Sequence, residues 1–113
     1  MIGVMTRVVI LFKQQPLPNQ PSAEQLRLRV QSLTKDSSKV EFDSPHLKTR
    51  MAERQINMRQ ILEVLRNGIV VSGPTLDPYG DWRIKLRRLV AGKRVQVVVA
   101  IGKGDTAAVV TAI

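Results

Sequence analysis

Hydrophobic and polar residues follow two different periods along this chain, and the change falls near Gly68. Before Gly68, apolar residues recur every three or four positions, which is typical of helices that bury one face. After Gly68, apolar and polar residues alternate singly, which is typical of strands in a half-covered sheet. The pattern therefore predicts an α+β fold, in which two or three N-terminal helices pack on a four-stranded antiparallel sheet.

The beginning of the chain fits neither period. Residues 1–13 are predicted to form an extended arm or a short strand, and residues 14–21 a linker, because three prolines block a helix. The arm reflects either an upstream translation start, with Met5 as the other candidate, or a strand exchanged with a partner. Its apolar run, residues 8–12, could add a strand to a partner's sheet and join copies of the chain. A single folded domain is expected over residues 22–113.

A first helix is predicted over residues 23–35. Ser22 can cap this helix, and Gln25 three residues later completes a capping box. The residues expected on its buried face are Leu26, Val30 and Leu33. A strand is the alternative, because residues 26–30 alternate strictly between apolar and basic side chains. The helix is favoured, and residues 39–42 follow it as a short extended segment.

Two further helices have well-marked ends in the sequence. Ser44 supplies a capping oxygen and Pro45 takes the first helical position of one, while Asn57 and Gln60 form the capping box of the other. Gly68 is expected to end the second helix in a left-handed C-cap. The residues expected to face the core are Leu47 and Met51 in the first helix and Met58, Ile61, Leu62 and Leu65 in the second.

Strands are predicted in the last third of the chain. They cover residues 69–71, 82–87, 95–101 and 107–113. The short connections between them indicate an antiparallel meander. The first strand is expected to stop at Gly73 and Pro74, and a shift of the alternation at Arg88 and Leu89 indicates a β-bulge. Residues 95–101 are apolar on both faces, so this strand should be central.

Composition excludes several classes of chemistry. The 113 residues contain no cysteine, which rules out disulfides, a thiol nucleophile and a cysteine-based zinc site, and favours a cytoplasmic location. His46 is the only histidine, and the nine carboxylates do not have the spacing of a metal site. The sequence has no glycine-rich phosphate loop and no serine nucleophile elbow. We therefore expect neither a metal nor a cofactor.

The net charge of +9 is concentrated in the part of the chain that is predicted to fold. Residues 44–113 hold twelve Lys and Arg against five Asp and Glu, a net charge of +7. A basic folded domain attracts polyanions, such as a nucleic acid, an acidic membrane or an acidic protein. The longest early apolar run is too short to span a bilayer, so we expect no membrane partner.

One strand face is predicted to bind nucleic acid. Arg83, Lys85 and Arg87 alternate with the apolar residues of their strand, and Arg94 is expected on the neighbouring strand. Such a row of cations is typical of a phosphate-binding surface. Lys48, on a preceding helix, is a further candidate contact. The alternative is an ordinary solvent-exposed face of a half-covered sheet.

Two aromatic residues lie near this row in the sequence. Trp82 alternates with apolar residues, so it is predicted to lie in the core rather than to stack on a base. Tyr79 falls in a predicted type I turn and is expected to pack there. Base stacking and acid chemistry are the alternatives for Tyr79.

A candidate catalytic site lies on the second predicted helix. His46, Arg50 and Arg54 are four residues apart, so they fall roughly on one helix face. The helix N-terminus and Arg50 both disfavour a positive imidazole, so His46 is expected to be neutral and able to take a proton from a ribose 2′-hydroxyl. Arg50 and Arg54 could then hold the phosphate and stabilise its developing charge. The alternative is that His46 bonds Asp43 or the backbone, and that the arginines pair with Glu53 or solvent.

The same residues carry a resemblance to a known family. The pattern Ser44-x-His46-x-x-x-Arg50-Met51-x-x-Arg54-x-Ile56, then Leu62, Leu65 and Gly68, resembles the bacterial "domain of unknown function 4258" proteins. The similarity continues through Gly73, Pro74, Asp77, Gly80, Trp82, Val97, Val98, Val99, Val110 and Thr111, and so covers residues 22–113. Leu47 replaces the alanine often found at its position.

The resemblance implies a function by analogy. That family is distantly similar to small RelE- and BrnT-type toxins, which place helices before a curved antiparallel sheet and act as ribonucleases neutralised by an antitoxin. By this analogy the fold is RelE-like, His46, Arg50 and Arg54 occupy the helix positions of the site, and Arg83 lies on the sheet face. The implied partners are RNA or a ribosome and an acidic antitoxin-like protein. Small domains of this kind often travel on mobile genetic elements.

Three functions follow from these observations. The first is a toxin-like, metal-independent ribonuclease in which His46 is the base and Arg50, Arg54 and Arg83 bind the scissile phosphate. The second is a non-catalytic nucleic-acid-binding module that uses the same basic surface without imidazole chemistry. The third is a protein-interaction or oligomerisation module that uses the N-terminal arm.

Overall fold

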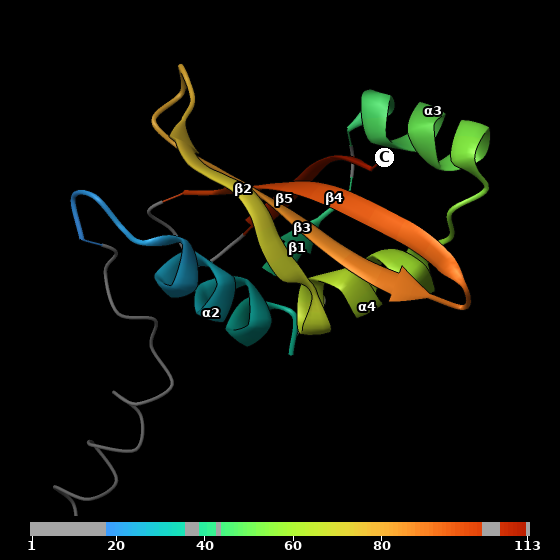
Figure 1. Ribbon diagram of the computed structural model, residues 1–113. Coiled ribbons are helices and arrows are strands. Elements are labelled where there is room, and N and C mark those ends of the chain that lie inside the picture. Colours follow the sequence, from blue (N-terminus) through green and yellow to red (C-terminus); the bar gives the residue numbers. More distant parts are fainter. Residues whose placement is uncertain (1–17, 36–38, 43, 103–106, 113) are drawn as a thin grey trace, which may run out of the picture.

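The structure of the chain is a computed structural model that describes residues 18–35, 39–42, 44–102 and 107–112. Within these residues three helices and five strands follow one another (Figure 1). In chain order they are α2 (Ala23–Leu33), β1 (Val40–Glu41), α3 (Pro45–Arg54), α4 (Met58–Asn67), β2 (Ile69–Leu76), β3 (Trp82–Val90), β4 (Lys93–Ile101) and β5 (Ala107–Ala112). The predicted α+β class is therefore confirmed, whereas the predictions for the arm of residues 1–13 lie outside the described residues.

The predicted capping residues begin all three helices. At α2, the hydroxyl of Ser22 accepts from the backbone N–H of Gln25 at 3.1 Å, and the Gln25 side chain accepts from Ser22 at 2.8 Å. Asn57 and Gln60 form the same reciprocal pair at α4, with distances of 2.8 and 2.9 Å. The side chain of Ser44 accepts from the backbone of α3. Each oxygen satisfies a backbone donor that has no partner inside its helix. Residues 26–30 lie within α2, so this segment is helical, and the alternative prediction of a strand is wrong.

The sheet has the strand order β1-β5-β4-β3-β2. The strands β2 to β5 form the predicted antiparallel meander, in which β4 lies between β3 and β5 as its apolar sequence indicated. The short strand β1 pairs in parallel with β5, through Val40 with Ala107 and Glu41 with Ala108. The prediction of four strands is therefore corrected to five, because a two-residue strand has no period of its own and its partner lies far along the chain.

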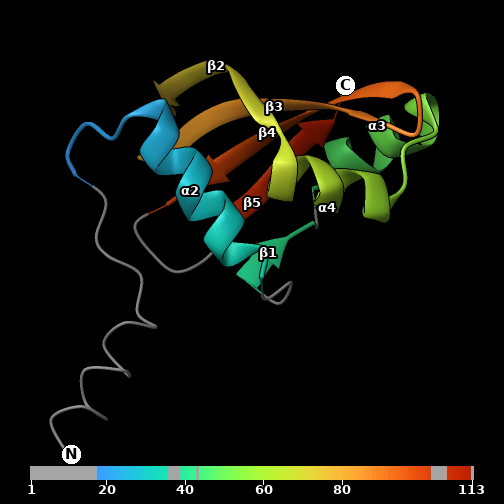
Figure 2. The same cartoon turned by 60° about the horizontal axis from the view of Figure 1, so that its bottom comes forward.

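The helices α2 and α4 lie side by side against one face of the sheet (Figures 1 and 2). The helix α2 packs mainly against β2, α4 packs against β3 and β4, and α3 packs against β5. The core contains Leu26, Val30, Leu33, Leu47, Ile61, Leu65, Ile84, Leu86, Val95, Val97 and Val99, all of them at most 1% exposed. Trp82 and Met51 pack against this core, as the sequence predicted.

The strand β2 differs from its prediction. It does not stop at Gly73 and Pro74 but continues to Leu76, with register shifts between Val70 and Ser72 and between Ser72 and Thr75. A proline is tolerated here because β2 is an edge strand, where no further strand needs its missing donor. The shifts accommodate the Gly-Pro pair without ending the strand.

The strand β3 has no bulge at Arg88 and Leu89, so that prediction is wrong. Its pairing with β4 runs without a break from Trp82 opposite Ile101 to Val90 opposite Lys93. Leu89 simply continues the outward-facing set, and it is 69% exposed. The apparent shift in the sequence came from an apolar residue on the exposed face of the strand rather than from an extra residue.

Gly68 connects α4 to β2 without the predicted left-handed C-cap. Its φ of −72° and ψ of 159° are extended, because β2 begins at the next residue. A Cβ at this position would lie 2.5 Å from the carbonyl oxygen of Val64 and 3.2 Å from that of Arg87. These distances are too short for any residue that has a Cβ, so the position requires glycine. Met58, predicted to be buried, is 38% exposed because the buried face of α4 begins at Ile61.

Two leucines of β3 provide a test of this arrangement. We expect Leu86→Ala to lower the free energy of unfolding by about 2–5 kcal/mol, because it leaves a cavity where a fully buried side chain packed. Leu89→Ala on the same strand is the matched control and should change it by less than about 0.5 kcal/mol. Urea unfolding followed by circular dichroism measures both, and equal losses would show that the two faces of β3 are wrongly assigned.

Candidate functional site

The predicted site residues form two separate sets. His46, Lys48, Arg50 and Arg54 lie on α3, whereas Arg83, Lys85 and Arg87 lie on β3 and Arg94 on β4. Among the described residues no side-chain hydrogen bond or ion pair joins one set to the other. The structure therefore contains two candidate sites.

The helix α3 has the predicted one-sided arrangement. Because it is regular from Pro45 to Arg54, residues four apart follow one another along the helix, with His46 and Arg54 exposed and Arg50 partly buried. The guanidinium of Arg50 forms an ion pair with Glu53 at 3.5 Å, as the alternative interpretation of the sequence predicts. The C-terminal end of the helix is attached to the sheet, because the ammonium of Lys93 donates to the carbonyls of Arg54 and Gln55.

The imidazole of His46 has no positioning partner in the described part of the chain. It is exposed, and no side-chain hydrogen bond to it is present there; Asp43, its predicted alternative partner, lies outside the described residues. Catalytic bases are typically oriented by a third group that fixes the ring. Of the described residues, none does this for His46, so α3 offers exposed charges rather than an assembled catalytic group.

The second set lies on the face of β3 and β4 that points away from α2 and α4. Ile84 and Leu86 are buried in the core beneath α4, so the residues between and beside them on β3 point to the opposite side. Arg94 pairs with Leu89 and is on that side as well. We call this surface the basic face; its charged residues are Arg83, Lys85, Arg87 and Arg94.

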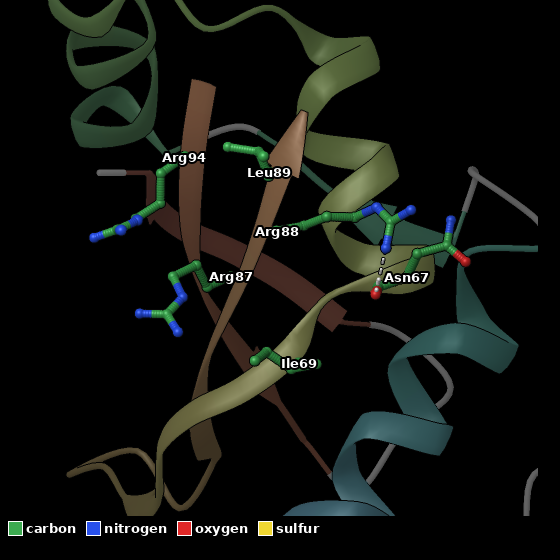
Figure 3. Close-up of a pocket in the computed structure, with 6 residues that line it drawn as sticks. All are labelled: Asn67, Ile69, Arg87, Arg88, Leu89 and Arg94. Atoms are coloured by element: carbon green, nitrogen blue, oxygen red, sulfur yellow. Dashed lines mark hydrogen bonds between the residues drawn. The ribbon is translucent and has the colours of Figure 1, made fainter. Parts of the chain in front are cut away.

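Arg87 and Arg94 are diagonal neighbours on the basic face. Arg87 pairs with Gln96, and Arg94 lies two residues before Gln96 on β4, a spacing of roughly 7–8 Å between Cα atoms. Figure 3 shows both guanidinium groups directed to the same side, together with Leu89. Within the described residues neither forms an ion pair or a side-chain hydrogen bond, and the same holds for Lys85. Like charges so placed repel each other unless an anion lies between them.

A hollow of about 360 Å³ lies beside these two arginines. Its lining residues are Asn67, Ile69, Arg87, Arg88, Leu89 and Arg94 (Figure 3). Arg88 points to the other side of β3, where it donates to Glu63 at 3.0 Å and to the Asn67 carbonyl at 3.2 Å. Ile69 and Leu89 are 58% and 69% exposed, so the hollow combines positive charge with apolar surface.

Sequence reasoning missed Ile69 and Leu89 as parts of the site. Ile69 pairs with Arg87 across β2 and β3, and this register cannot be read from either strand alone. Leu89 did carry a signal, because uninterrupted alternation from Arg83 places it on the same face as Arg87. The predicted bulge obscured that signal.

Arg83 differs from the other cations of the basic face, because it is bound to Asp77. Its Nε donates to the Asp77 carboxylate at 3.1 Å, and that carboxylate also accepts the backbone N–H groups of Asp81 and Tyr79, each at 2.9 Å. The Asp77 side chain is only 5% exposed. The N–H of Asp81 is the largest cause of the lowered pKa of Asp77, and Arg83 and Tyr79 add to it. Arg83 therefore anchors the β2–β3 loop.

Tyr79 is the central residue of this loop, and the prediction that it packs there is wrong. It is 85% exposed, so its ring contacts almost nothing in the described structure. The backbone around it is nevertheless ordered by Asp77, and the Gly80 N–H donates to the Asp77 carbonyl at 3.1 Å, the hydrogen bond expected of a β-turn.

Comparison with known proteins assigns a family without an activity. The family model described as "Domain of unknown function (DUF4258)" matches residues 44–113, which include α3, α4 and the strands β2 to β5. No curated protein and no solved structure matches the chain. The analogy to RelE- and BrnT-type toxins therefore stays a prediction.

Among the described residues, no group of three acidic or histidine side chains is placed to hold a metal ion, and no helix is long and apolar enough to cross a membrane.

Asp77 gives a pH-dependent prediction. Because folding lowers the pKa of Asp77, its contribution to stability is present above the ordinary carboxyl value and is lost as the pH falls through the lowered value. We expect Asp77→Asn to be less stable than the unmodified chain at neutral pH, with the difference shrinking in acid. Urea unfolding at a series of pH values measures this difference.

The matched control is Asp81→Asn, because the carboxylate of Asp81 receives no hydrogen bond from the described residues. A stability gap between Asp77→Asn and the unmodified chain that did not change with pH would contradict the assignment. The same conclusion would follow if Asp81→Asn showed the same gap.

Proposed function

The chain belongs to the domain of unknown function 4258 family, whose description states no activity, and we propose from the geometry of the basic face that it binds nucleic acid. The observation that carries the proposal is the pair of diagonal arginines, Arg87 and Arg94, which have no anionic partner among the described residues. RNA, free or in a ribosome, is the partner that a cytoplasmic location would supply.

The negative charge of a phosphate backbone is complementary to the positive charge of this surface. Arginine binds phosphate oxygens through a planar fork of donors, and two such groups on neighbouring strands can bind one phosphate or two successive ones. Lys85 adds a third cation on the same face. Neutralising phosphates also releases counterions, so binding through this face should weaken steeply with added salt.

The apolar residues beside the arginines favour a nucleic acid over a small anion. Ile69 and Leu89 are exposed at the rim of the hollow and can contact sugars or base edges while the arginines hold phosphates. An acidic antitoxin-like protein would bind to the same cations of the basic face. Direct binding of purified RNA or DNA, in the absence of any protein partner, separates the two.

A toxin-like ribonuclease centred on α3 is the second candidate. It is favoured by the regular helix from Pro45 to Arg54, which leaves His46 and Arg54 accessible along the helix. In this candidate His46 is the base, while Arg50 and Arg54 hold the scissile phosphate. Arg50 would have to leave Glu53 to do so, because the two now form an ion pair.

The first test concerns Arg87 and Arg94. We expect Arg87→Ala and Arg94→Ala each to weaken binding of a labelled RNA, and to reduce the slope of log affinity against log salt by about 0.7–0.9 for each phosphate that the variant no longer binds. Fluorescence anisotropy across a salt series measures affinity and slope together. The matched control is Arg66→Ala, which removes an exposed arginine of α4 that likewise has no described ion-pair partner.

Two outcomes would contradict the proposal. One is an affinity that does not fall with salt, because phosphate contacts always carry that dependence. The other is a loss for Arg66→Ala as large as the loss for Arg87→Ala, because general charge rather than the basic face would then explain the binding.

The second test separates binding from catalysis. If the basic face binds nucleic acid without cleaving it, purified chain should leave RNA intact, and His46→Ala should bind with unchanged affinity. If α3 is catalytic, induction of the unmodified chain in a bacterial host should arrest growth, and His46→Ala at equal protein level should relieve the arrest. Gel analysis of RNA and growth curves measure the two outcomes.

A further inference from the structure

Among the large hydrophobic side chains of the described structure, Tyr79 is the most exposed, and nothing in the proposed phosphate contacts uses it. It is the only tyrosine of the chain, and it is 85% exposed. An aromatic ring so exposed in water has a cost that packing in the turn would have avoided. Its position leaves the ring accessible to a binding partner that could cover it.

The loop holds the backbone that carries the ring in a defined place. The Asp77 carboxylate accepts the N–H of Tyr79, while the Asp77 backbone N–H donates to the Asp81 carbonyl at 2.8 Å and closes the loop. Gly80 has a φ of +85°, a conformation that favours glycine and lets the chain reverse at this point. Because the backbone is ordered before any ligand arrives, binding through the ring loses little backbone entropy.

The loop is also attached to the basic face. One carboxylate, that of Asp77, binds both the backbone N–H of Tyr79 and the guanidinium of Arg83. Arg83 begins the row that continues with Lys85 and Arg87, with a spacing of roughly 6.6 Å between successive members of the row. The aromatic residue thus stands beside one end of the row, and the hollow lined by Arg87 and Arg94 lies at the other end of β3.

We propose that the nucleic acid bound by the basic face is single-stranded, and that Tyr79 stacks on one of its unpaired bases. This inference rests on the proposed function. A row of cations with an aromatic residue beside it is the combination that binds single strands, in which cations hold the backbone and rings stack on bases. The bases of a duplex are already stacked on each other, so they present no free face to the ring.

The test compares Tyr79→Ala and Tyr79→Phe on three probes of one sequence, about 12 nucleotides long: single-stranded RNA, single-stranded DNA and the DNA duplex. Tyr79→Ala should weaken single-strand binding roughly 5- to 140-fold, the range for loss of one stacked base. Tyr79→Phe keeps the ring and should retain the affinity. The duplex should bind more weakly than either single strand, and Tyr79→Ala should leave its affinity unchanged.

The outcomes separate this inference from the proposed function. If Arg87→Ala weakens single-strand binding but Tyr79→Ala does not, the stacking role is wrong and the basic face still binds nucleic acid. If Tyr79→Phe loses as much as Tyr79→Ala, the hydroxyl rather than the ring acts, and stacking is wrong. If the duplex binds as tightly as the single strands, single-strand selection is wrong. If the unmodified chain binds none of the probes, the proposed function fails together with this inference.

Discussion

Burial of Ile84 and Leu86 beneath α4 is the constraint on which the candidate site depends. Successive side chains of a strand point to opposite faces, so burying these two forces Arg83, Lys85 and Arg87 onto the other face. Burying one such apolar side chain contributes about 1.5–3 kcal/mol, whereas cross-strand pairs, of which Arg87 with Arg94 is one, change stability on a scale of about 0.2–1 kcal/mol. Core packing therefore outweighs the repulsion, and the fold holds a row of cations together.

The connections at the ends of β2 determine what lies around that row. At one end, Gly68 lets α4 pass directly into β2 at a distance that a Cβ would not allow, and this brings Ile69 opposite Arg87. At the other end, Asp77 binds Arg83 and orders the loop that carries Tyr79. The same strand thus places an apolar residue at one end of the basic face and an aromatic residue at the other.

The two candidate sites differ in how far the fold organises them. On α3, helical geometry alone aligns His46 with Arg50, and the described residues add no group that orients the imidazole. On the basic face, strand pairing brings Arg87 and Arg94 together from β3 and β4, and an adjacent hollow adds apolar contacts. Binding requires accessible charges in a fixed array, whereas catalysis requires each group to be oriented, so the geometry favours binding.

The sequence by itself determined the features that depend on near neighbours. These are the capped starts of the helices, such as Ser22 with Gln25, and the alternation that sends Lys85 outward, because a few consecutive residues specify them. Only the tertiary structure decided that Val40 pairs in parallel with Ala107. Such contacts join distant segments, and their register is set by the packing of the whole core rather than by local preference.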